Sequence, residues 1–239
     1  MRTVLITGGV GFFGGLLKEH LLARGFRCVS VDLEPDDSRH PKLVAVQGDI
    51  RDRATLEAIF SRHPFDAIYH CAAILAHATR DKKFLWTSNV DGTTNIAEFA
   101  RTYHVPQVIF TSSNCLWGEP HGRLVREDDP PHPVEIYGRS KLAAEQILWE
   151  YRQYFNVIII RCPTIIDRGR LGVLSILLEF FDEGRKVWVV GRGHNRYQFI
   201  AAPDLIDACI KALDYQGSDI FHIGAAHVGV RAMCGTSGG

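Results

Sequence analysis

The chain has 239 residues, of which 46% are hydrophobic and 23% charged, as is ordinary for a folded globular protein. Its 27 lysine and arginine residues balance its 27 aspartate and glutamate residues, which argues against nucleic acid or an anionic membrane as a partner. Its apolar runs are far shorter than a membrane-spanning helix requires.

Neither the cysteines nor the histidines predict a metal site. No two of the 6 cysteines have Cys-x-x-Cys spacing, and no two of the 11 histidines have His-x-x-x-His or His-x-His spacing. Several cysteines lie in apolar runs, which indicates buried thiols in a reducing compartment. The N-terminal residues run directly into glycines without the apolar region of a signal peptide. We therefore expect a cytoplasmic protein without a metal.

Short β-branched runs alternate along the chain with longer amphipathic segments, which is the pattern of a parallel sheet with crossover helices. In chain order, this pattern predicts a strand at 4–6, a helix at 12–23, strands at 28–31 and 43–46, a helix at 54–60, a strand at 67–69, one long helix at 82–103 and a strand at 108–110.

A polar, proline-rich loop at 119–134 follows, and loops of that length are usually functional or disordered. The remaining predicted elements are a helix at 137–154, a strand at 157–160, a helix at 173–181, a strand at 186–190, a helix at 203–213, a strand at 220–222 and a disordered tail at 233–239. The predicted fold class is therefore α/β, with a Rossmann-type doubly wound parallel sheet.

A glycine-rich turn joins the first strand to the first helix. It fits Gly-x-x-Gly-x-x-Gly as Gly8, Gly11 and Gly14, and it fits Gly-x-Gly-x-x-Gly when Gly9 replaces Gly8. Missing side chains let the backbone approach a pyrophosphate, and the helix N-terminus supplies amide donors. Glycines also serve ordinary tight turns, so the motif gains weight only from its context.

Asp32 supplies that context, because it ends the second strand 18 residues after Gly14. A carboxylate there can accept hydrogen bonds from both ribose hydroxyls of an adenosine, and its charge repels the 2′-phosphate of NADP. The alternative is a plain strand-end turn, a common role for aspartate. Strand, glycines and acid in this order predict NAD as the cofactor.

Tyr137 and Lys141 lie one helical turn apart and therefore on one helix face. A neighbouring ammonium favours a phenolate, so the pair suits proton transfer to or from a hydroxyl while a cofactor carries hydride. Such a pair also occurs by chance on surface helices. Ser112 and Ser113 follow the strand at 108–110, at the sheet edge where open α/β sheets bind ligands, and a serine hydroxyl there can polarise a substrate oxygen.

With these residues the chain resembles the extended short-chain dehydrogenases, and within them the nucleotide-sugar epimerase/dehydratase family. The resemblance covers roughly residues 1–224 and rests on Thr7–Gly14, Asp32, Gly48–Ile50, His70–Ala73, Asn89–Thr93, Ser112–Ser113 and Tyr137–Lys141. It implies an NAD-binding domain at 1–165 to which 199–224 returns, a small, incomplete C-terminal substrate lobe at 166–198, and a tail at 225–239.

The resemblance also implies residue roles. The cofactor would be bound by Gly8, Gly11, Phe12, Phe13, Gly14, Asp32, Asp49, Ile50, Ala72, Ala73, Asn89, Tyr137 and Lys141. Asp49 and Ile50 would flank the adenine, and Asn89 would support the active-site geometry. The catalytic residues would be Tyr137, Lys141 and Ser113, with Ser112 supporting Ser113.

The family's 4,6-dehydratases carry an Asp-Glu pair where this chain has Asn114 and Cys115, which disfavours dehydration. The resemblance therefore implies an NAD-dependent epimerase of a nucleotide sugar, acting by oxidation and re-reduction at C4. The same residues would equally serve an NAD-dependent dehydrogenase or reductase of a hydroxyl-bearing small molecule. A non-catalytic NAD-binding module is the more distant alternative.

At the substrate end the chain departs from the family pattern. The diphosphate-binding arginine of the epimerases corresponds best to Arg196, and the substrate-contacting asparagine is replaced by Thr164. Family members extend further beyond the last strand, so we expect an incomplete substrate pocket. The family's pairing of the long helix with the helix from Tyr137 implies a homodimer.

Overall fold

The computed structural model describes residues 1–118, 125–126, 128–168, 183 and 198–224. Its centre is a sheet of seven strands that all run parallel, in the order β3-β2-β1-β4-β5-β6-β9. The strands are β1 (Thr3–Thr7), β2 (Arg27–Asp32), β3 (Leu43–Gln47), β4 (Ala67–His70), β5 (Gln107–Ser113), β6 (Asn156–Cys162) and β9 (Asp219–His222). The order reverses between β1 and β4, which confirms the doubly wound fold.

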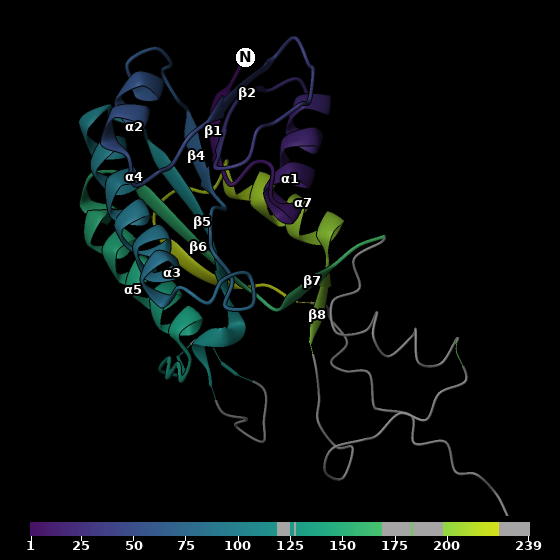
Figure 1. The fold of residues 1–239 in the computed structure, drawn as a ribbon, viewed down its shortest axis with the longest axis vertical. Coiled ribbons are helices and arrows are strands. Elements are labelled where there is room, and N and C mark those ends of the chain that lie inside the picture. Colours follow the sequence, from purple (N-terminus) through teal and green to yellow (C-terminus); the bar gives the residue numbers. More distant parts are fainter. Residues whose placement is uncertain (119–124, 127, 169–182, 184–197, 225–239) are drawn as a thin grey trace, which may run out of the picture.

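Helices cover both faces of the sheet, as Figure 1 shows. One face carries α2 (Arg53–Phe60), α3 (Lys82–Asn89), α4 (Asp91–Thr102) and α5 (Ile136–Glu150), and the other carries α1 (Phe12–Ala23) and α7 (Ala202–Ala212). Side chains alternate between two cores, because successive strand residues point to opposite faces. Leu5 packs in the core under α2, α4 and α5, whereas its neighbours Val4 and Ile6 pack in the core under α1 and α7.

The helix predicted at 82–103 is interrupted at Val90, so that part of the prediction is wrong. Thr93 and Thr94 each donate a side-chain hydrogen bond to the backbone carbonyl four residues earlier, at 2.6 Å and 3.0 Å. Such bonds compete with the helix ladder and bend helices. Just beyond the break, a Cβ on Gly92 would lie 2.6 Å from the Ile50 side chain, so the glycine lets α4 approach the segment after β3.

Two short strands that the sequence pattern did not predict, β7 (Thr164–Ile166) and β8 (Phe199–Ala201), form a separate parallel pair. The helix predicted from Tyr137 begins at Ile136, and its last turn is the 3-10 helix η2 (Tyr151–Gln153). A second 3-10 turn, η1 (Asn114–Leu116), follows β5. The helix predicted at 173–181, the strand at 186–190 and the tail at 233–239 lie outside the described residues. No helix in the described part of the chain has the length and apolar character needed to cross a membrane.

The loop after β2 is joined to α1 by a buried ion pair. The Lys18 ammonium contacts the Asp36 carboxylate, and the two side chains are only 4% and 7% exposed. Asp36 also accepts a hydrogen bond from the backbone N–H of Ser38 at 3.0 Å. Burial alone would raise the pKa of Asp36, but the hydrogen bonds from Lys18 and Ser38 outweigh it and the pKa is lowered. The sequence offered no sign of this pair.

Asp36→Asn should lower the free energy of unfolding at neutral pH by about 3 kcal/mol or more, because it leaves a buried ammonium without its counter-charge. Since the folded-state pKa of Asp36 is lowered, its contribution is present above the unfolded value near ~3.9 and is lost as the pH falls below that value. Urea unfolding between pH 3 and pH 7 measures both effects. Asp37→Asn, at an exposed neighbour, is the matched control, and an equal loss in both variants would contradict the assignment.

Candidate active site

A pocket lies at the carboxyl ends of the first four strands, at the point where the strand order reverses. Ligands bind at this position in doubly wound sheets. Its walls come from the segments that follow β1, β2, β3 and β4, together with one residue of α3. The lining residues are Gly8, Gly11, Val31, Asp32, Leu33, Gly48, Asp49, Ile50, Cys71, Ala72, Ala73, Ile74 and Ser88.

The three glycine positions of the first turn are occupied by glycine for different structural reasons. Gly8 has φ +74°, and a Cβ on it would lie 2.7 Å from the backbone N and Cα of Ala72. A Cβ on Gly14 would lie 2.1 Å from the carbonyl oxygen of Gly8. Gly11 is exposed in the pocket wall, and its nearest neighbour would be 3.2 Å from a Cβ. Gly8 and Gly14 are therefore required by the fold, whereas Gly11 keeps the helix N-terminus open to a ligand.

Phe12 and Phe13 form the first turn of α1, but their side chains pack toward the core beneath it rather than line the pocket. Only their backbone N–H groups remain at the helix N-terminus, where an anion would be bound.

Asp32 forms the strand-end turn that the sequence offered as one alternative, and it also faces the pocket. One carboxylate oxygen accepts from the N–H of Glu34 at 3.2 Å, as in a strand-end turn. The other accepts from the N–H of Val10 at 2.9 Å, which ties the end of β2 to the glycine turn. The residue also lines the pocket. The turn therefore holds the carboxylate at the pocket wall.

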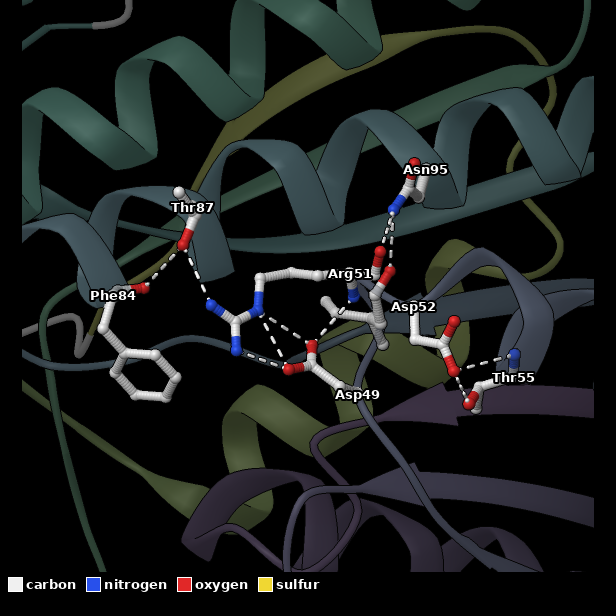
Figure 2. Close-up of polar contacts among 8 residues, drawn as sticks. Asp49, Arg51, Asp52, Thr55, Phe84, Thr87 and Asn95 are labelled. Carbon is white, nitrogen blue, oxygen red and sulfur yellow. Dashed lines mark hydrogen bonds and ion pairs between the residues drawn. The ribbon is translucent and has the colours of Figure 1, made fainter.

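Asp49 lines the pocket together with Ile50, Ala72 and Ala73, and Arg51 fixes its carboxylate (Figure 2). The Arg51 Nε lies 3.1 Å and 2.9 Å from the two carboxylate oxygens, its Nη2 lies 2.5 Å from one of them, and the Arg51 backbone N–H adds a fourth bond at 2.8 Å. Burial alone would raise the pKa of Asp49, but the bonds from Arg51 outweigh it and the pKa is lowered. Asp49 is therefore an ionised acceptor.

Lys141 is buried in α5, with 2% of its surface exposed, and its ammonium lies 4.0 Å from the ring centroid of Phe110. Burial lowers the pKa of Lys141 to about 8, although the nearby Cys162, Cys71 and Glu145 oppose the shift. Groups with perturbed pKa values cluster at functional sites.

Tyr137 lies in the first turn of the same helix, and although the residue as a whole is partly exposed, its phenol group is buried. The sequence predicted that Lys141 brings the pKa of the phenol toward neutrality, but in this structure the pKa of Tyr137 is raised. The main cause is burial, to which the neighbouring Cys115 and Cys162 thiols add. The Lys141 charge is instead directed to the face of Phe110. In this state the phenol therefore holds its proton.

Ser113 lies opposite Cys162 in the register of β5 and β6. Cys162 contributes to the electrostatics of both Tyr137 and Lys141, so the three predicted catalytic residues converge on one end of the sheet. The Ser113 oxygen accepts from the N–H of Cys115 at 3.2 Å, so its own hydrogen is still able to donate. Ser112 is buried, and its hydroxyl has no partner.

Asn89 does not line the pocket but joins three segments behind it. Its side chain accepts from the Ile74 N–H at 2.7 Å and donates to the Ile74 carbonyl at 3.1 Å and to the Ser140 hydroxyl at 3.0 Å. Ser140 in turn donates to the carbonyl of Tyr137 at 2.7 Å. This arrangement agrees with a supporting role for Asn89.

Besides Ser113, two further substrate residues were predicted, Thr164 and Arg196. Thr164 is exposed at the start of β7, and Arg196 lies outside the described residues. Sequence reasoning missed Arg51, Thr87 and Ser88. Arg51 follows Asp49 in the Asp-Ile-Arg run, but nothing in the sequence indicated that it folds back onto that carboxylate.

The chain matches a known protein family. The model of the NAD dependent epimerase/dehydratase family matches residues 4–224. The chain therefore belongs to that family, and the NAD expected from the sequence is the family's cofactor.

Relatives cover nearly the whole chain. It is 36% identical to the uncharacterized protein y4nG of Sinorhizobium fredii, over 96% of this chain and 58% of that protein. It is 29% identical to a UDP-glucose 4-epimerase of Lacticaseibacillus casei, over 94% of this chain and 77% of that protein. The chain thus spans little more than half the length of the first relative.

Solved structures have the same fold. The Bordetella bronchiseptica enzyme WbmH, in complex with NAD+, superposes with a TM-score of 0.82 at 27% identity, over 96% of this chain and 77% of that one. A Thermus thermophilus UDP-glucose 4-epimerase in complex with NAD gives a TM-score of 0.81 at 26% identity, over 95% of this chain and 79% of that one.

Direct titration should find the Lys141 ammonium losing its proton near pH 8, well below the ordinary lysine value of about 10.4. Nuclear magnetic resonance of carbon-13-labelled lysine measures this pKa, with exposed lysines in the same spectrum as reference. Phe110→Leu should lower the pKa further, because it removes a ring face that attracts the cation. An ordinary lysine midpoint for Lys141 would contradict this account of its burial.

Proposed function

We propose that this chain carries the NAD-binding and catalytic part of an epimerase that acts on a nucleotide sugar by transient oxidation and re-reduction at C4. The observation that carries the proposal is the buried Lys141 one helical turn from Tyr137, with Ser113 at the end of the neighbouring strand. A buried ammonium beside a phenol and a hydroxyl suits proton transfer at a sugar hydroxyl.

The residues of the pocket fit NAD. Gly11 keeps the start of α1 open for a pyrophosphate, Asp32 presents a carboxylate at the position of the adenosine ribose, and Asp49 and Ile50 line the next part of the wall. When bound, oxidised NAD supplies the hydride acceptor and a positive charge that lowers the pKa of a neighbouring phenol.

The chain's own residues manage the proton. Tyr137 accepts the proton of the sugar's C4 hydroxyl and later returns it. Ser113 donates a hydrogen bond to the same oxygen, and Lys141 would bind the nicotinamide ribose. Because the pKa of Tyr137 is raised, the phenol must first lose its own proton before it can accept the C4 proton; after the oxidation step it holds that proton and serves as the acid of the reduction step.

A nucleotide sugar is favoured as substrate because the family relatives include UDP-glucose 4-epimerases. We propose that Thr164 and Arg196 contact it. The substrate pocket as a whole is proposed for the complete protein rather than for this chain alone. Asn114 and Cys115 are exposed in η1 and offer no carboxylic acid, which favours epimerisation over 4,6-dehydration. The homodimer through α4 and α5, the cytoplasmic location and the division into an NAD-binding domain and a substrate lobe stay predictions.

The purified protein should retain NAD through gel filtration and should convert UDP-glucose to its C4 epimer without added cofactor. Tyr137→Phe should lower turnover about 100-fold or more while leaving NAD bound, because positioned proton transfer typically contributes that much. Chromatography of the sugar nucleotides measures turnover, and absorbance of the denatured supernatant measures NAD.

Tyr154→Phe is the matched control for that variant, because Tyr154 is 55% exposed beyond the end of α5 and should be silent. If NADH accumulates only when substrate is added, the chain is a dehydrogenase instead. Near wild-type turnover in Tyr137→Phe would refute the proposed mechanism.

Asp32→Asn should weaken NAD binding about 10-fold and reduce the preference for NAD over NADP, because it removes the charge that repels a 2′-phosphate while keeping the shape of the side chain. Calorimetric titration with each dinucleotide measures the ratio of affinities. Glu34→Gln changes an exposed acid two residues away and serves as control. An unchanged ratio in Asp32→Asn would remove the residue from the cofactor site.

A further inference from the structure

Arg161 and Glu145 form a buried ion pair close to the predicted catalytic residues. Arg161 lies near the end of β6 and Glu145 lies in α5, and their side chains are only 8% and 4% exposed. Nε of Arg161 lies 3.1 Å and 3.2 Å from the two carboxylate oxygens, and Nη2 lies 2.7 Å from one of them. A single guanidinium therefore binds both oxygens of Glu145.

Two further side chains fix the guanidinium of Arg161. Its Nη1 lies 3.2 Å from Nε2 of His222, which must be the acceptor because arginine can only donate. The guanidinium carbon also lies 5.2 Å from the centroid of the Trp117 ring, and the Trp117 and His222 rings lie 5.0 Å apart. A planar guanidinium with contacts to three side chains keeps one orientation toward Glu145.

Glu145 lies one helical turn after Lys141, and a lysine and a glutamate with that spacing can pair on one helix face. They do not pair here. In the described part of the chain the Lys141 ammonium has no carboxylate partner, and it lies 4.0 Å from the centroid of the Phe110 ring. The carboxylate that could bind Lys141 is bound by Arg161 instead.

Glu145 is nevertheless the neighbour whose charge acts on Lys141. The other titratable side chains around Lys141 are neutral near pH 8, where the lysine titrates, and these are Cys71, Cys162, His70 and Tyr137. Burial raises the pKa of both thiols and of the phenol, and it lowers the pKa of the imidazole. Of these neighbours, Glu145 alone carries a charge at that pH, because it is paired as a carboxylate with Arg161.

We propose that Arg161 is a positioning residue that holds the Glu145 carboxylate away from Lys141, so that the ammonium stays free to bind the nicotinamide ribose. The inference rests on the proposed role of Lys141 in NAD binding and adds to it a residue that acts through Glu145. Without Arg161, the buried carboxylate would be left with Lys141 as the cation on its own helix face.

The first measurement is the pKa of Lys141 in the ligand-free full chain, by nuclear magnetic resonance of carbon-13-labelled lysine. Arg161→Met should raise this pKa from about 8 to roughly 9 or above, because the unpaired carboxylate then stabilises the ammonium. Arg161→Met combined with Glu145→Gln should return the pKa close to the wild-type value, because both charges are removed. Glu145→Gln alone should lower it, because the guanidinium is left without its counter-charge.

Arg152→Met is the matched control for the loss of one positive charge, because Arg152 is exposed just beyond α5 and should leave the pKa of Lys141 unchanged. Equal pKa values of Lys141 in the wild type and in Arg161→Met would overturn the proposal. A pKa in the double variant as high as in Arg161→Met would overturn it as well. If Arg161→Met does not fold, Glu145→Gln decides, and an unchanged pKa in that variant would overturn the proposal.

The second measurement tests the consequence for the cofactor, because NAD contains the nicotinamide ribose and ADP does not. In calorimetric titrations of the full chain, Arg161→Met should weaken NAD binding about 10-fold and leave ADP binding unchanged. Adding Glu145→Gln should restore the affinity for NAD. An equal loss for both ligands would overturn the positioning role. If the wild type bound neither NAD nor ADP, the proposed function would fail, whereas the pKa of Lys141 would still test the role of Arg161.

Discussion

The close approach of Gly8 to the Ala72 backbone is the constraint on which the rest of the site depends. β1 and β4 are neighbours at the point where the strand order reverses, so the chain leaves them in different directions and opens a crevice. The crevice stays open only if no side chain fills it. The backbones of Gly8 and Ala72 lie so close together that not even a Cβ fits at Gly8. The floor of the pocket is therefore backbone, and its selectivity comes from the side chains around it.

A series of buried hydrogen bonds connects that contact to the end of α3. The Ala72 N–H donates to the Thr7 hydroxyl at 3.2 Å, and that hydroxyl lies 2.7 Å from Nδ1 of His70. Nε2 lies 2.8 Å from the hydroxyl of Thr93, which itself donates to the carbonyl of Asn89. Thr93 must therefore accept from Nε2–H, and Nδ1 must accept from Thr7. Burial, helped by the charge of Lys141, lowers the pKa of His70 to about 3, so the ring stays neutral. Each hydrogen bond in the series therefore keeps one donor and one acceptor.

The sequence predicted the features that depend on a repeating pattern along the chain or on residues placed at the ends of strands. The alternation of β-branched runs predicted the parallel sheet, and the placement of Gly8, Asp32 and Ser113 at strand ends predicted one edge, because parallel strands all end there. It could not predict contacts between side chains brought together by tertiary packing. Lys18 and Asp36 look like ordinary surface charges in the sequence. Ser88 looks like an ordinary helix residue, and only its unpaired burial distinguishes it. The strands β7 and β8 were missed because each has three residues and finds its partner more than thirty residues away.

The electrostatics of Tyr137 and Lys141 were the hardest part to infer, because spacing alone does not reveal how deeply each group is buried. Burial disfavours whichever form is charged, so it lowers the pKa of the lysine and raises that of the tyrosine. Both pKa shifts favour the uncharged form of the side chain, which opposes catalysis by a phenolate. An added positive charge in the same crevice lowers the pKa of the phenol but also lowers that of the lysine further. The face of Phe110 resists the second effect, because it stabilises the ammonium without supplying a proton acceptor. The Phe110 ring beside Lys141 thus favours the charged form of the lysine, against the effect of burial.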